Sequence, residues 1–322
     1  MALSKDELFR KIKERIEKDG NEYKAGVPAK EMLEYVYGDR LPDGDMKFKD
    51  IKKTLKEETI AIYEEYINKP LDKRVIRKPV DNSFNNCNGR WTEYVFDVFA
   101  WNKLSEINKA LGSDECFVYV KLPSRSETFW SSLLGEKPKK EIESKEADLG
   151  EIGAKLESSN PDAVILRLKK EECSKSWDPC VPLKDLSLKS QEIINSVYKA
   201  CEGKVVLAKQ LVAFLSVKSS TRADRRYQWI VEGNSTKGLY AVAFRKENRD
   251  RTLSAQMRDK FFAFSFDEEK EADKKALSDL IMFASLFNEE AIGITYAIDG
   301  LYSCVTPNQV TAKIEEICKK HI

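Results

Sequence analysis

The chain has 322 residues, enough for one large domain or two smaller ones with a sizeable buried core. Its 55 lysines and arginines nearly balance 54 aspartates and glutamates, so the net charge of +1 gives no overall attraction for nucleic acid or membranes. Hydrophobic residues make up 42% of the sequence, but no apolar run is long enough to cross a bilayer and the amino terminus has no signal-peptide pattern. The composition excludes a membrane-spanning or wholly disordered protein and predicts a soluble, cytoplasmic one, in which any charged site is local.

Cysteine and histidine usage narrows the chemistry further. The seven cysteines are odd in number and widely spread, without the close pairs that build zinc sites, so we expect reduced thiols mostly in the core. The single histidine, His321, is expected in a frayed end of the chain. Catalytic triads based on histidine and histidine metal sites are therefore almost ruled out.

The amino-terminal third is predicted to be mainly helical, with helices over residues 4–19, 29–37 and 47–67. Ser4 and Glu7 have capping-box spacing, which marks the start of the first helix. The segment from Lys69 to Pro79 is basic and contains prolines, which is typical of a boundary. We therefore predict a helical region, possibly a subdomain, over residues 1–78 and a second domain over residues 79–322.

The rest of the chain alternates between helical and strand patterns. A long helix is predicted from Trp91 to Leu111, with Glu93 in its first turns. Residues 136–151 are mostly charged and contain a proline, which predicts an exposed loop. Strands are predicted over residues 116–122, 162–168, 211–218, 261–266 and 293–298, and helices over residues 187–201, 225–244, 270–287 and 307–320. The predicted fold class is α/β, with a central mixed β-sheet flanked by helices.

Two of the buried strands carry a charged residue at one end. Asp162 heads the strand over residues 162–168, and Lys218 ends the strand over residues 211–218. If the two strand ends are adjacent, a hard oxygen ligand and an ammonium meet, as Mg²⁺-dependent phosphodiester hydrolysis needs. Acids after proline and lysines at strand ends are also common without any catalytic role, so the pair alone leaves both interpretations open.

Two glutamates are candidates to join this site. Glu232 follows Lys218 by 14 residues, on the next predicted helix, and Glu93 lies on the long helix. Either carboxylate could act as a metal ligand, and Glu93 could act through an intervening water. As isolated residues, however, most glutamates are exposed charges on helices.

A string of charged residues directly follows the strand that carries Lys218, namely Arg222-Ala-Asp224-Arg225-Arg226. Arginine offers two parallel donors that fit guanine, and a carboxylate accepts a hydrogen bond from cytosine, so this string could read adjacent G·C pairs in a major groove. Residues 218–251 hold nine basic and four acidic residues, a positive strip suited to a polyanion. A solvated turn with internal ion pairs is the alternative.

In these residues the sequence resembles type II restriction endonucleases of the PD-(D/E)XK superfamily, in the branch that recognises sites with a CCGG core. The similarity covers residues 81–244 and is weak or absent in the first 75. Four blocks carry it in order: residues 81–93 (DNSFNNCNGRWTE), 159–162 (SNPD), 214–226 (FLSVKSSTRADRR) and 227–233 (YQWIVEG).

The resemblance implies a restriction-endonuclease-like core and assigns roles to the candidate residues. It implies a Mg²⁺ site whose ligands are Asp162, Glu232, the backbone carbonyl of Ser216 and Glu93, the last directly or through water. Lys218 would position the attacking water. Arg222, Asp224 and Arg225 would read the inner base pairs, and Arg226 would also contact DNA. The superfamily's usual acid two residues before the lysine is replaced by Ser216, and in this branch Glu232 supplies that carboxylate instead.

The same resemblance implies the substrate and partners. We expect hydrolysis of both strands of double-stranded DNA at a palindromic CCGG-containing site, leaving 5′-phosphate and 3′-hydroxyl ends; a CCNGG core stays open. A palindromic site implies a homodimer or homotetramer. A cognate DNA methyltransferase is implied for host protection, and no membrane partner is expected. Two alternatives remain: a site-specific DNA-binding protein without cleavage, and a structure-specific nuclease of the same superfamily.

Overall fold

The computed structural model describes residues 3–18, 27–67, 79, 81–123, 130–151, 153, 160–173, 176–219, 223–247, 257–268 and 296–322. The chain divides into two compact units. The first contains Met1–Phe99, Leu183–Glu192 and Val305–Val310, and the second contains Ala100–Pro182, Ile193–Cys304 and Thr311–Ile322. The boundary predicted after residue 78 falls in a stretch outside the described residues.

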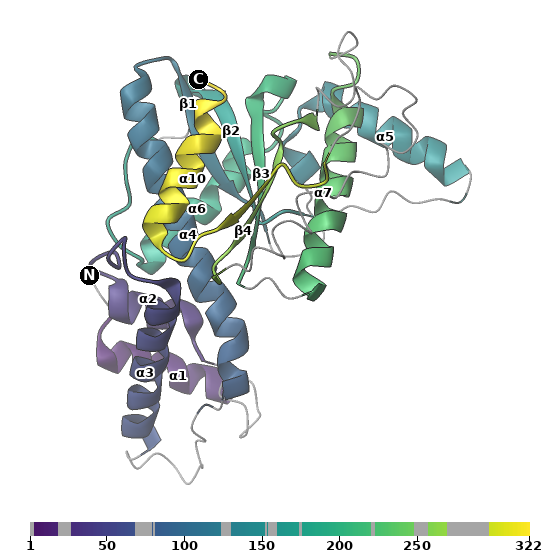
Figure 1. The fold of residues 1–322 in the computed structure, drawn as a ribbon. Coiled ribbons are helices and arrows are strands. Elements are labelled where there is room, and N and C mark those ends of the chain that lie inside the picture. The colour runs from purple at the N-terminus through teal and green to yellow at the C-terminus, as the bar shows by residue number, and fades with distance from the viewer. Residues whose placement is uncertain are drawn as a thin grey trace. The chain divides into compact units, whose positions relative to one another are not determined.

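The amino-terminal region is mainly helical, as predicted. Its helices are α1 Lys5–Lys18, α2 Ala29–Tyr37, α3 Phe48–Ile67 and the first part of α4 Asp81–Leu111 (Figure 1). The capping box at the start of α1 is confirmed, because the Glu7 amide donates to Ser4 Oγ at 3.3 Å and the Ser4 amide donates to Glu7 Oε2 at 3.1 Å. Leu8 and Ile12 form part of the buried face of this helix.

Helix α4 begins at Asp81, ten residues before the predicted start at Trp91. Residues 81–90 contain four asparagines and a glycine, which are poor helix formers. Packing overrides that preference, since Phe84, Cys87 and Trp91 are all buried at helical spacing. Glu93 consequently lies well inside the helix and not in its first turns, so that part of the prediction was wrong.

The second unit is built on a five-stranded sheet. The strands lie in the order β1-β2-β3-β4-β5, which are β1 Glu115–Lys121, β2 Ala163–Lys169, β3 Leu211–Lys218, β4 Phe261–Ser265 and β5 Gly300–Ser303. The pairs β1/β2 and β2/β3 are antiparallel, whereas β3/β4 and β4/β5 are parallel. The predicted mixed sheet is therefore confirmed.

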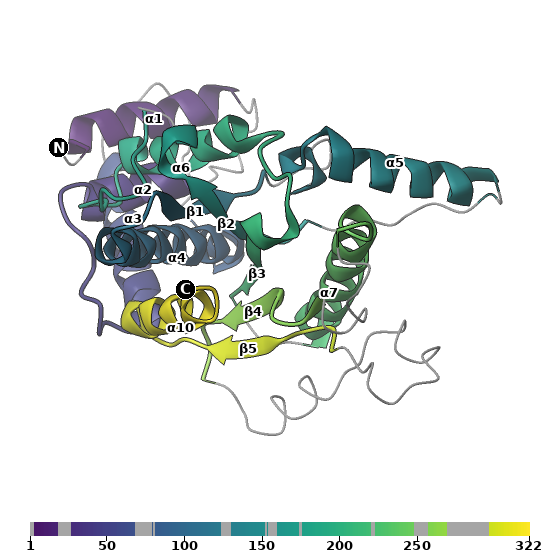
Figure 2. The same cartoon turned by 90° about the horizontal axis from the view of Figure 1, so that it is seen from above.

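Helices cover both faces of this sheet, as predicted. They are α5 Glu136–Glu151, α6 Leu188–Cys201, α7 Ala223–Ala243 and α10 Pro307–Lys319, with short 3₁₀ turns at Trp130–Leu133, Lys170–Glu172 and Ala208–Gln210. Figure 2 shows α7 on one face, with α10 and the carboxyl-terminal part of α4 on the other. The face that carries α7 is the one that matters for the site.

Residues 136–151 form helix α5 and not the predicted loop. Pro138 is the third residue of the helix, where a missing backbone N–H costs no intrahelical hydrogen bond. Pro138 and Ile142 are buried, and ion pairs one turn apart, such as Lys139 with Glu143 at 3.9 Å, support the exposed face. A highly charged composition was therefore misread as irregular structure.

The last strand also differs from the prediction, which placed a strand over residues 293–298. Residues 291–295 lie outside the described part of the chain, and β5 begins only at Gly300. Just before it, Asp299 Oδ2 accepts hydrogen bonds from the amides of Lys260 (2.8 Å) and Phe261 (2.9 Å), so a side chain takes up backbone donors at the start of β4. The predicted helix over residues 270–287 lies outside the described residues as well.

The expectation of a frayed end at His321 was wrong. Its carbonyl accepts a hydrogen bond from Arg167 Nη1 at 2.5 Å, and its amide donates to the carbonyl of Cys318 at 2.9 Å. Burial of the imidazole, with a further contribution from the nearby Lys260 ammonium, lowers the pKa of His321 to about 4.

This lowered pKa predicts a pH-dependent stability that is specific to one side chain. A group whose pKa is lower in the folded than in the unfolded state stabilises the fold above its unfolded value of 6.5, and that contribution is lost as pH falls toward about 4. We expect His321→Gln to show a shallower fall of Tm than wild type between these two pH values, measured by differential scanning calorimetry. Parallel Tm curves would contradict the prediction.

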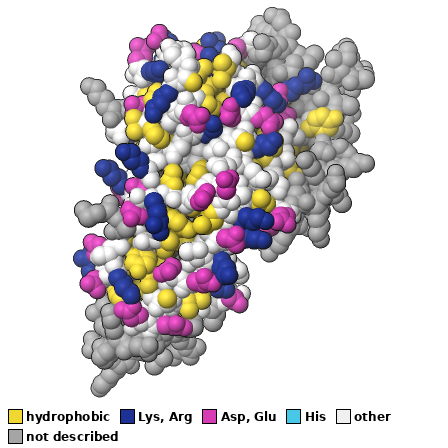
Figure 3. All heavy atoms as spheres, turned by 60° about the vertical axis from the view of Figure 1, so that its left-hand side comes forward, with side chains coloured by type: hydrophobic (Ala, Val, Ile, Leu, Met, Phe, Trp, Pro, Cys, Tyr) yellow, Lys and Arg dark blue, Asp and Glu magenta, His cyan; other side chains and the backbone are white. Residues whose placement is uncertain are grey.

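The surface carries both signs of charge. On the face shown in Figure 3, basic and acidic side chains are interspersed, consistent with the net charge of +1. Among the described residues, no helix combines the length and apolarity needed to span a membrane. Five of the seven cysteines are buried.

Candidate active site

The antiparallel pairing of β2 with β3 brings Asp162 and Lys218 together. Ala163 pairs with Leu215, so the start of β2 and the end of β3 lie at the same edge of the sheet. Asp162, just before β2, donates its amide hydrogen to the Leu215 carbonyl at 2.9 Å. Lys218 is the last residue of β3, so the condition stated for the pair, that the two strand ends be adjacent, is met in the structure.

The Asp162 carboxylate is held in a defined orientation by its neighbours. Its Oδ2 accepts from the Val217 amide at 2.6 Å, and it lies 3.3 Å from Lys218 Nζ and 3.4 Å from the Ser216 hydroxyl. The side chain remains 32% exposed, so one side of the carboxylate stays accessible to solvent or substrate.

Glu232 reaches the same place from α7, which packs over β3 and β4. Glu232 Oε2 accepts from the Ser216 hydroxyl at 2.5 Å, and Oε1 lies 3.3 Å from Lys218 Nζ. The residue is 7% exposed, which is unusual for a glutamate. It faces inward because it shares a helix face with buried Trp229 and Thr236.

Ser216 links the two acids, and sequence reasoning missed this role of its side chain. Its hydroxyl lies within hydrogen-bonding distance of both Asp162 and Glu232. From the sequence, Ser216 was expected to contribute only its backbone carbonyl, at the position where the superfamily usually has an acid. A signal was present, because side chains two apart on a strand share a face, which places Ser216 beside Lys218.

The pKa values of Lys218 and Glu232 both depend on burial and on the neighbouring charges. Burial lowers the pKa of Lys218, but Asp162 and Glu232 outweigh that effect and raise the pKa above its usual value. Burial also raises the pKa of Glu232, and Asp162 adds to this rise, while Lys218 and Ser216 oppose it. With two carboxylates and one ammonium the ionised site has an excess negative charge, which favours binding of a further cation.

The donor set fits Mg²⁺. Mg²⁺ prefers oxygen ligands and is commonly held by one or two carboxylates, with waters and substrate phosphate completing its shell. Asp162 and Glu232 supply two carboxylates that already converge on one hydroxyl and one ammonium. The described residues contain no group of three or more aspartate, glutamate, histidine or cysteine side chains that could together hold a metal ion. A cation here would therefore rely on water, backbone or DNA oxygens for its remaining ligands.

Glu93 was predicted to join the same site. Glu93 lies on α4, partly buried, in the compact unit that does not contain Asp162. Its part in the site stays a prediction.

The predicted base-reading string lies at the start of α7. Arg222 is outside the described residues, and Asp224 lies in the first turn with its side chain outside them. Arg225 and Arg226 are partly exposed, and Arg225 Nη1 donates to Gln228 Oε1 at 3.0 Å. The string thus leads directly into the helix that carries Glu232.

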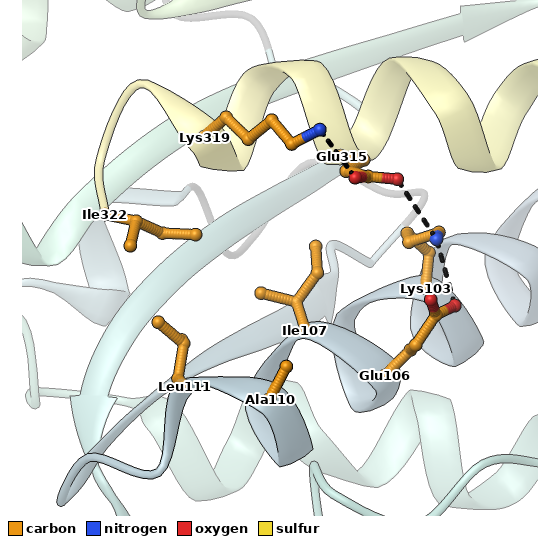
Figure 4. Close-up of a pocket in the computed structure, with 8 residues that line it drawn as sticks. All are labelled: Lys103, Glu106, Ile107, Ala110, Leu111, Glu315, Lys319 and Ile322. Atoms are coloured by element: carbon orange, nitrogen blue, oxygen red, sulfur yellow. Dashed lines mark hydrogen bonds and ion pairs between the residues drawn. The ribbon is translucent and has the colours of Figure 1, made fainter.

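A separate pocket between α4 and α10 offers different chemistry. It has a volume of about 240 Å³ and is shown in Figure 4. Ile107, Leu111 and Ile322 give it an aliphatic lining. Its charged residues neutralise one another, since Lys103 pairs with Glu106 (2.9 Å) and Glu315 (3.2 Å), and Lys319 pairs with Glu315 (2.7 Å). The cluster around Ser216 is the stronger candidate for a catalytic centre.

The fold is that of a restriction endonuclease. Two solved structures match over 90% of this chain and 91% of theirs at 20% identity, namely "Bse634I restriction endonuclease" (TM-score 0.73) and "Type IIF restriction endonuclease Bse634I with cognate DNA" (TM-score 0.74). The model of the Cfr10I/Bse634I restriction endonuclease family matches residues 45–320, and the chain belongs to this family.

A curated relative supports the same assignment over a shorter stretch. The type II restriction enzyme Cfr10I of Citrobacter freundii is 31% identical over 161 residues, which is 50% of this chain. The match spans about half of that relative's length, 54%.

Proposed function

We propose that this protein is a type II restriction endonuclease that hydrolyses both strands of double-stranded DNA at a palindromic site with a CCGG core, using Mg²⁺. The observation that carries the proposal is the convergence of the Asp162 and Glu232 carboxylates on the Ser216 hydroxyl and the Lys218 ammonium in a member of this family. Site-specific binding alone requires none of these three side chains.

Each residue of the cluster has a distinct proposed role. Asp162 and Glu232 hold the cation through their carboxylates, the Ser216 carbonyl is a further oxygen ligand, and Glu93 contributes directly or through a water. Bound Mg²⁺ would make a water more acidic and offset the negative charge that builds on the phosphate. The Ser216 hydroxyl lies between the two carboxylates and holds them near each other before a metal binds.

Lys218 orients the attacking water in this proposal. Its pKa is raised despite burial, so the side chain is an ammonium at neutral pH and acts as a hydrogen-bond donor and positive charge, not as a base. Attack on phosphorus breaks the bond to the 3′ oxygen, leaving a 5′ phosphate and a 3′ hydroxyl. A positive group fixed in advance lowers the free energy of the transition state without reorganisation.

Recognition is proposed to come from the string at the start of α7. Arg222 and Arg225 would each make two hydrogen bonds to guanine, Asp224 would accept from cytosine, and Arg226 would contact DNA nearby. The same groups could read a CCNGG core. The solved Bse634I complex contains cognate DNA, which supports double-stranded DNA as the substrate class.

The proposed assembly and setting follow from a palindromic site. A two-fold symmetric site is best matched by a homodimer, and a homotetramer would hold two sites at once. Cleavage activity in a cell implies a cognate DNA methyltransferase that protects host DNA, and the enzyme would act in the cytoplasm.

The proposal is tested by incubating the protein with long natural DNA, with Mg²⁺ and with EDTA. We expect discrete fragments only with Mg²⁺, and sequencing of the fragment ends should reveal one shared palindrome. No cleavage would favour a binding protein, and a smear would favour a structure-specific nuclease. Arg225→Ala should relax the preference at one base pair, while Asp162→Ala serves as the inactive control.

A further inference from the structure

We propose that Gly233 and Lys237 are positioning residues, which dock α7 against residues 296–299 and thereby set the position of the Glu232 carboxylate. This inference rests on the proposed role of Glu232 as a metal ligand. The docking contacts involve residues outside the cluster around Ser216, so they can be changed without touching a proposed ligand.

At Gly233, next to Glu232, α7 lies very close to the backbone of Ala297. A β-carbon at Gly233 would lie 2.2 Å from the carbonyl oxygen of Ala297 and 3.3 Å from the ring of Phe261. The first of these contacts is with backbone, so it cannot be relieved by rotating a side chain. Any larger residue at position 233 must move the helix or the segment at Ala297.

Lys237, one turn further along α7, forms an ion pair and a hydrogen bond with residues 296–299. It is fully buried, its Nζ lies 2.5 Å from Asp299 Oδ2, and it donates to the Tyr296 carbonyl at 2.7 Å. A buried lysine is costly unless its charge is paired, and removal of one partner leaves the other uncompensated. The pair therefore permits only a narrow range of helix positions.

Asp299 connects this docking point to the sheet. Its Oδ2 also accepts the amides of Lys260 and Phe261, where β4 begins. Strand β4 pairs in parallel with β3, and Ser216 is opposite Ala263. The helix is thus fixed to β4 at Gly233 and Lys237, while Glu232 reaches across to Ser216 on β3.

A small displacement of α7 at Gly233 is expected to change the position of the Glu232 carboxylate enough to affect metal binding. Groups in a catalytic constellation must be held to within about 0.5 Å of their productive geometry. Relief of a 2.2 Å contact to an ordinary van der Waals distance requires a shift larger than that tolerance, at the residue adjacent to the glutamate.

The chain supplies a matched pair of variants on one helix. Gly233→Ala introduces the contact with Ala297, whereas a β-carbon at Gly238 would meet nothing within 4 Å. Both changes replace a helical glycine by alanine, so both raise helix propensity equally. A difference between the two variants therefore reports the docking contact and not the propensity.

Three measurements are made on each full-length variant: Tm, the Mg²⁺ concentration for half-maximal single-turnover cleavage, and the Ca²⁺ concentration for half-maximal enhancement of binding. The DNA probe is a short duplex centred on the site that wild type cleaves. We expect Gly238→Ala to match wild type. Gly233→Ala should need about tenfold more of either ion, the size seen when outer contacts of a metal site are lost, while binding without metal stays unchanged. Equal ion requirements for the two folded variants would overturn the proposal.

A second pair of variants tests the charge contact and covers the case in which Gly233→Ala fails to fold. Lys237→Met combined with Asp299→Asn removes both charges while keeping similar volumes. Lys313→Met, which breaks an exposed pair with Glu316, is the control. The double variant should show the same rise in ion requirement as Gly233→Ala. A wild-type ion requirement in the folded double variant would reject the role of Lys237.

The Glu232→Gln background separates failure of this inference from failure of the proposed function. If the docking residues act through Glu232, Gly233→Ala should add nothing to the Ca²⁺ requirement of Glu232→Gln. Wild-type ion dependence in Glu232→Gln would reject the ligand assignment itself. The alternative outcome is that Gly233→Ala raises the Ca²⁺ requirement to the same extent in the wild-type and Glu232→Gln backgrounds. That result would leave Glu232 assigned as a metal ligand but would reject the inference that Gly233 acts by positioning Glu232.

Discussion

Glu232→Ala is expected to fold and to bind its DNA site but to cleave it more than about 100-fold more slowly, since loss of a direct ligand should exceed the 10–100-fold cost of losing an outer contact. The reason is the loss of one of the two carboxylates that the described part of the chain places beside Ser216 and Lys218. Single-turnover cleavage in Mg²⁺ measures the rate, and binding in Ca²⁺ measures recognition separately. A Glu232→Ala variant that cleaves like wild type would contradict the ligand assignment.

Moving the carboxylate should restore part of this activity. Ser216 Oγ lies 2.5 Å from Glu232 Oε2, so a carboxylate at position 216 enters the space that Glu232→Ala vacates. Ser216→Asp is the better choice than Ser216→Glu, because its carboxyl carbon takes the place of the serine hydroxyl and its oxygens extend one bond further. We expect Glu232→Ala combined with Ser216→Asp to recover Mg²⁺-dependent cleavage at the same DNA site.

The single variant Ser216→Asp is the matched control. With Glu232 still present it adds a third carboxylate to a buried site that has one ammonium, so like-charge repulsion should reduce activity or raise the pKa of one acid. The same substitution is thus expected to be harmful in wild type and beneficial in Glu232→Ala. Equal effects in the two backgrounds would show that the two positions do not share a site.

Lys218→Met is expected to slow cleavage by a different route, with a loss of about 10²–10³-fold, the cost of removing one preorganised donor. The variant keeps the length of the side chain but loses the charge that lies 3.3 Å from both carboxylates. Asp162 and Glu232 should then bind a divalent ion at least as well as in wild type, because the variant lacks the Lys218 ammonium that contacts both carboxylates.

The role of Lys218 at the water is identified by measuring the maximal cleavage rate and the Mg²⁺ requirement separately. Lys218→Met should slow single-turnover cleavage without raising the Mg²⁺ concentration for half-maximal rate, and DNA binding in Ca²⁺ should survive. Lys218→Arg should not restore the full rate, since a planar guanidinium cannot place its donors as an ammonium does. Lys139→Met, which breaks an exposed pair with Glu143 on α5, is the control for loss of a lysine. A parallel loss of DNA binding would contradict the assignment.

Most strands and helices could be predicted because their patterns are local. The strand Leu211–Lys218 is a continuous apolar run ending in a charge, and the structure has it with the predicted bounds. The start of α4 could not be predicted, because Phe84 and Cys87 override the asparagines around them only through tertiary packing. α5 was missed because its stability depends on ion pairs along the helix and on two buried side chains.

The candidate site could be predicted only in part, for a geometric reason. Asp162 and Lys218 lie close together because β2 and β3 are antiparallel. The relative direction of two strands cannot be predicted from the residues of either strand. Its spacing after Lys218 made Glu232 a candidate for the site, and the resemblance assigned it the role of a metal ligand. Lys237 could not be found at all, because lysines are almost never fully buried unless paired, and its partner Asp299 lies 62 residues away.

Helix α7 has a consequence for how specificity can change during evolution or engineering. It begins at Ala223, within the proposed base-reading string, and carries Glu232 between two and three turns later. Because each residue of an α-helix adds about 100° of rotation, one insertion or deletion between Arg226 and Glu232 would turn the carboxylate away from Ser216. New specificities should therefore arise by exchange of side chains within the string, or by length changes before Ala223, but not by length changes inside the helix.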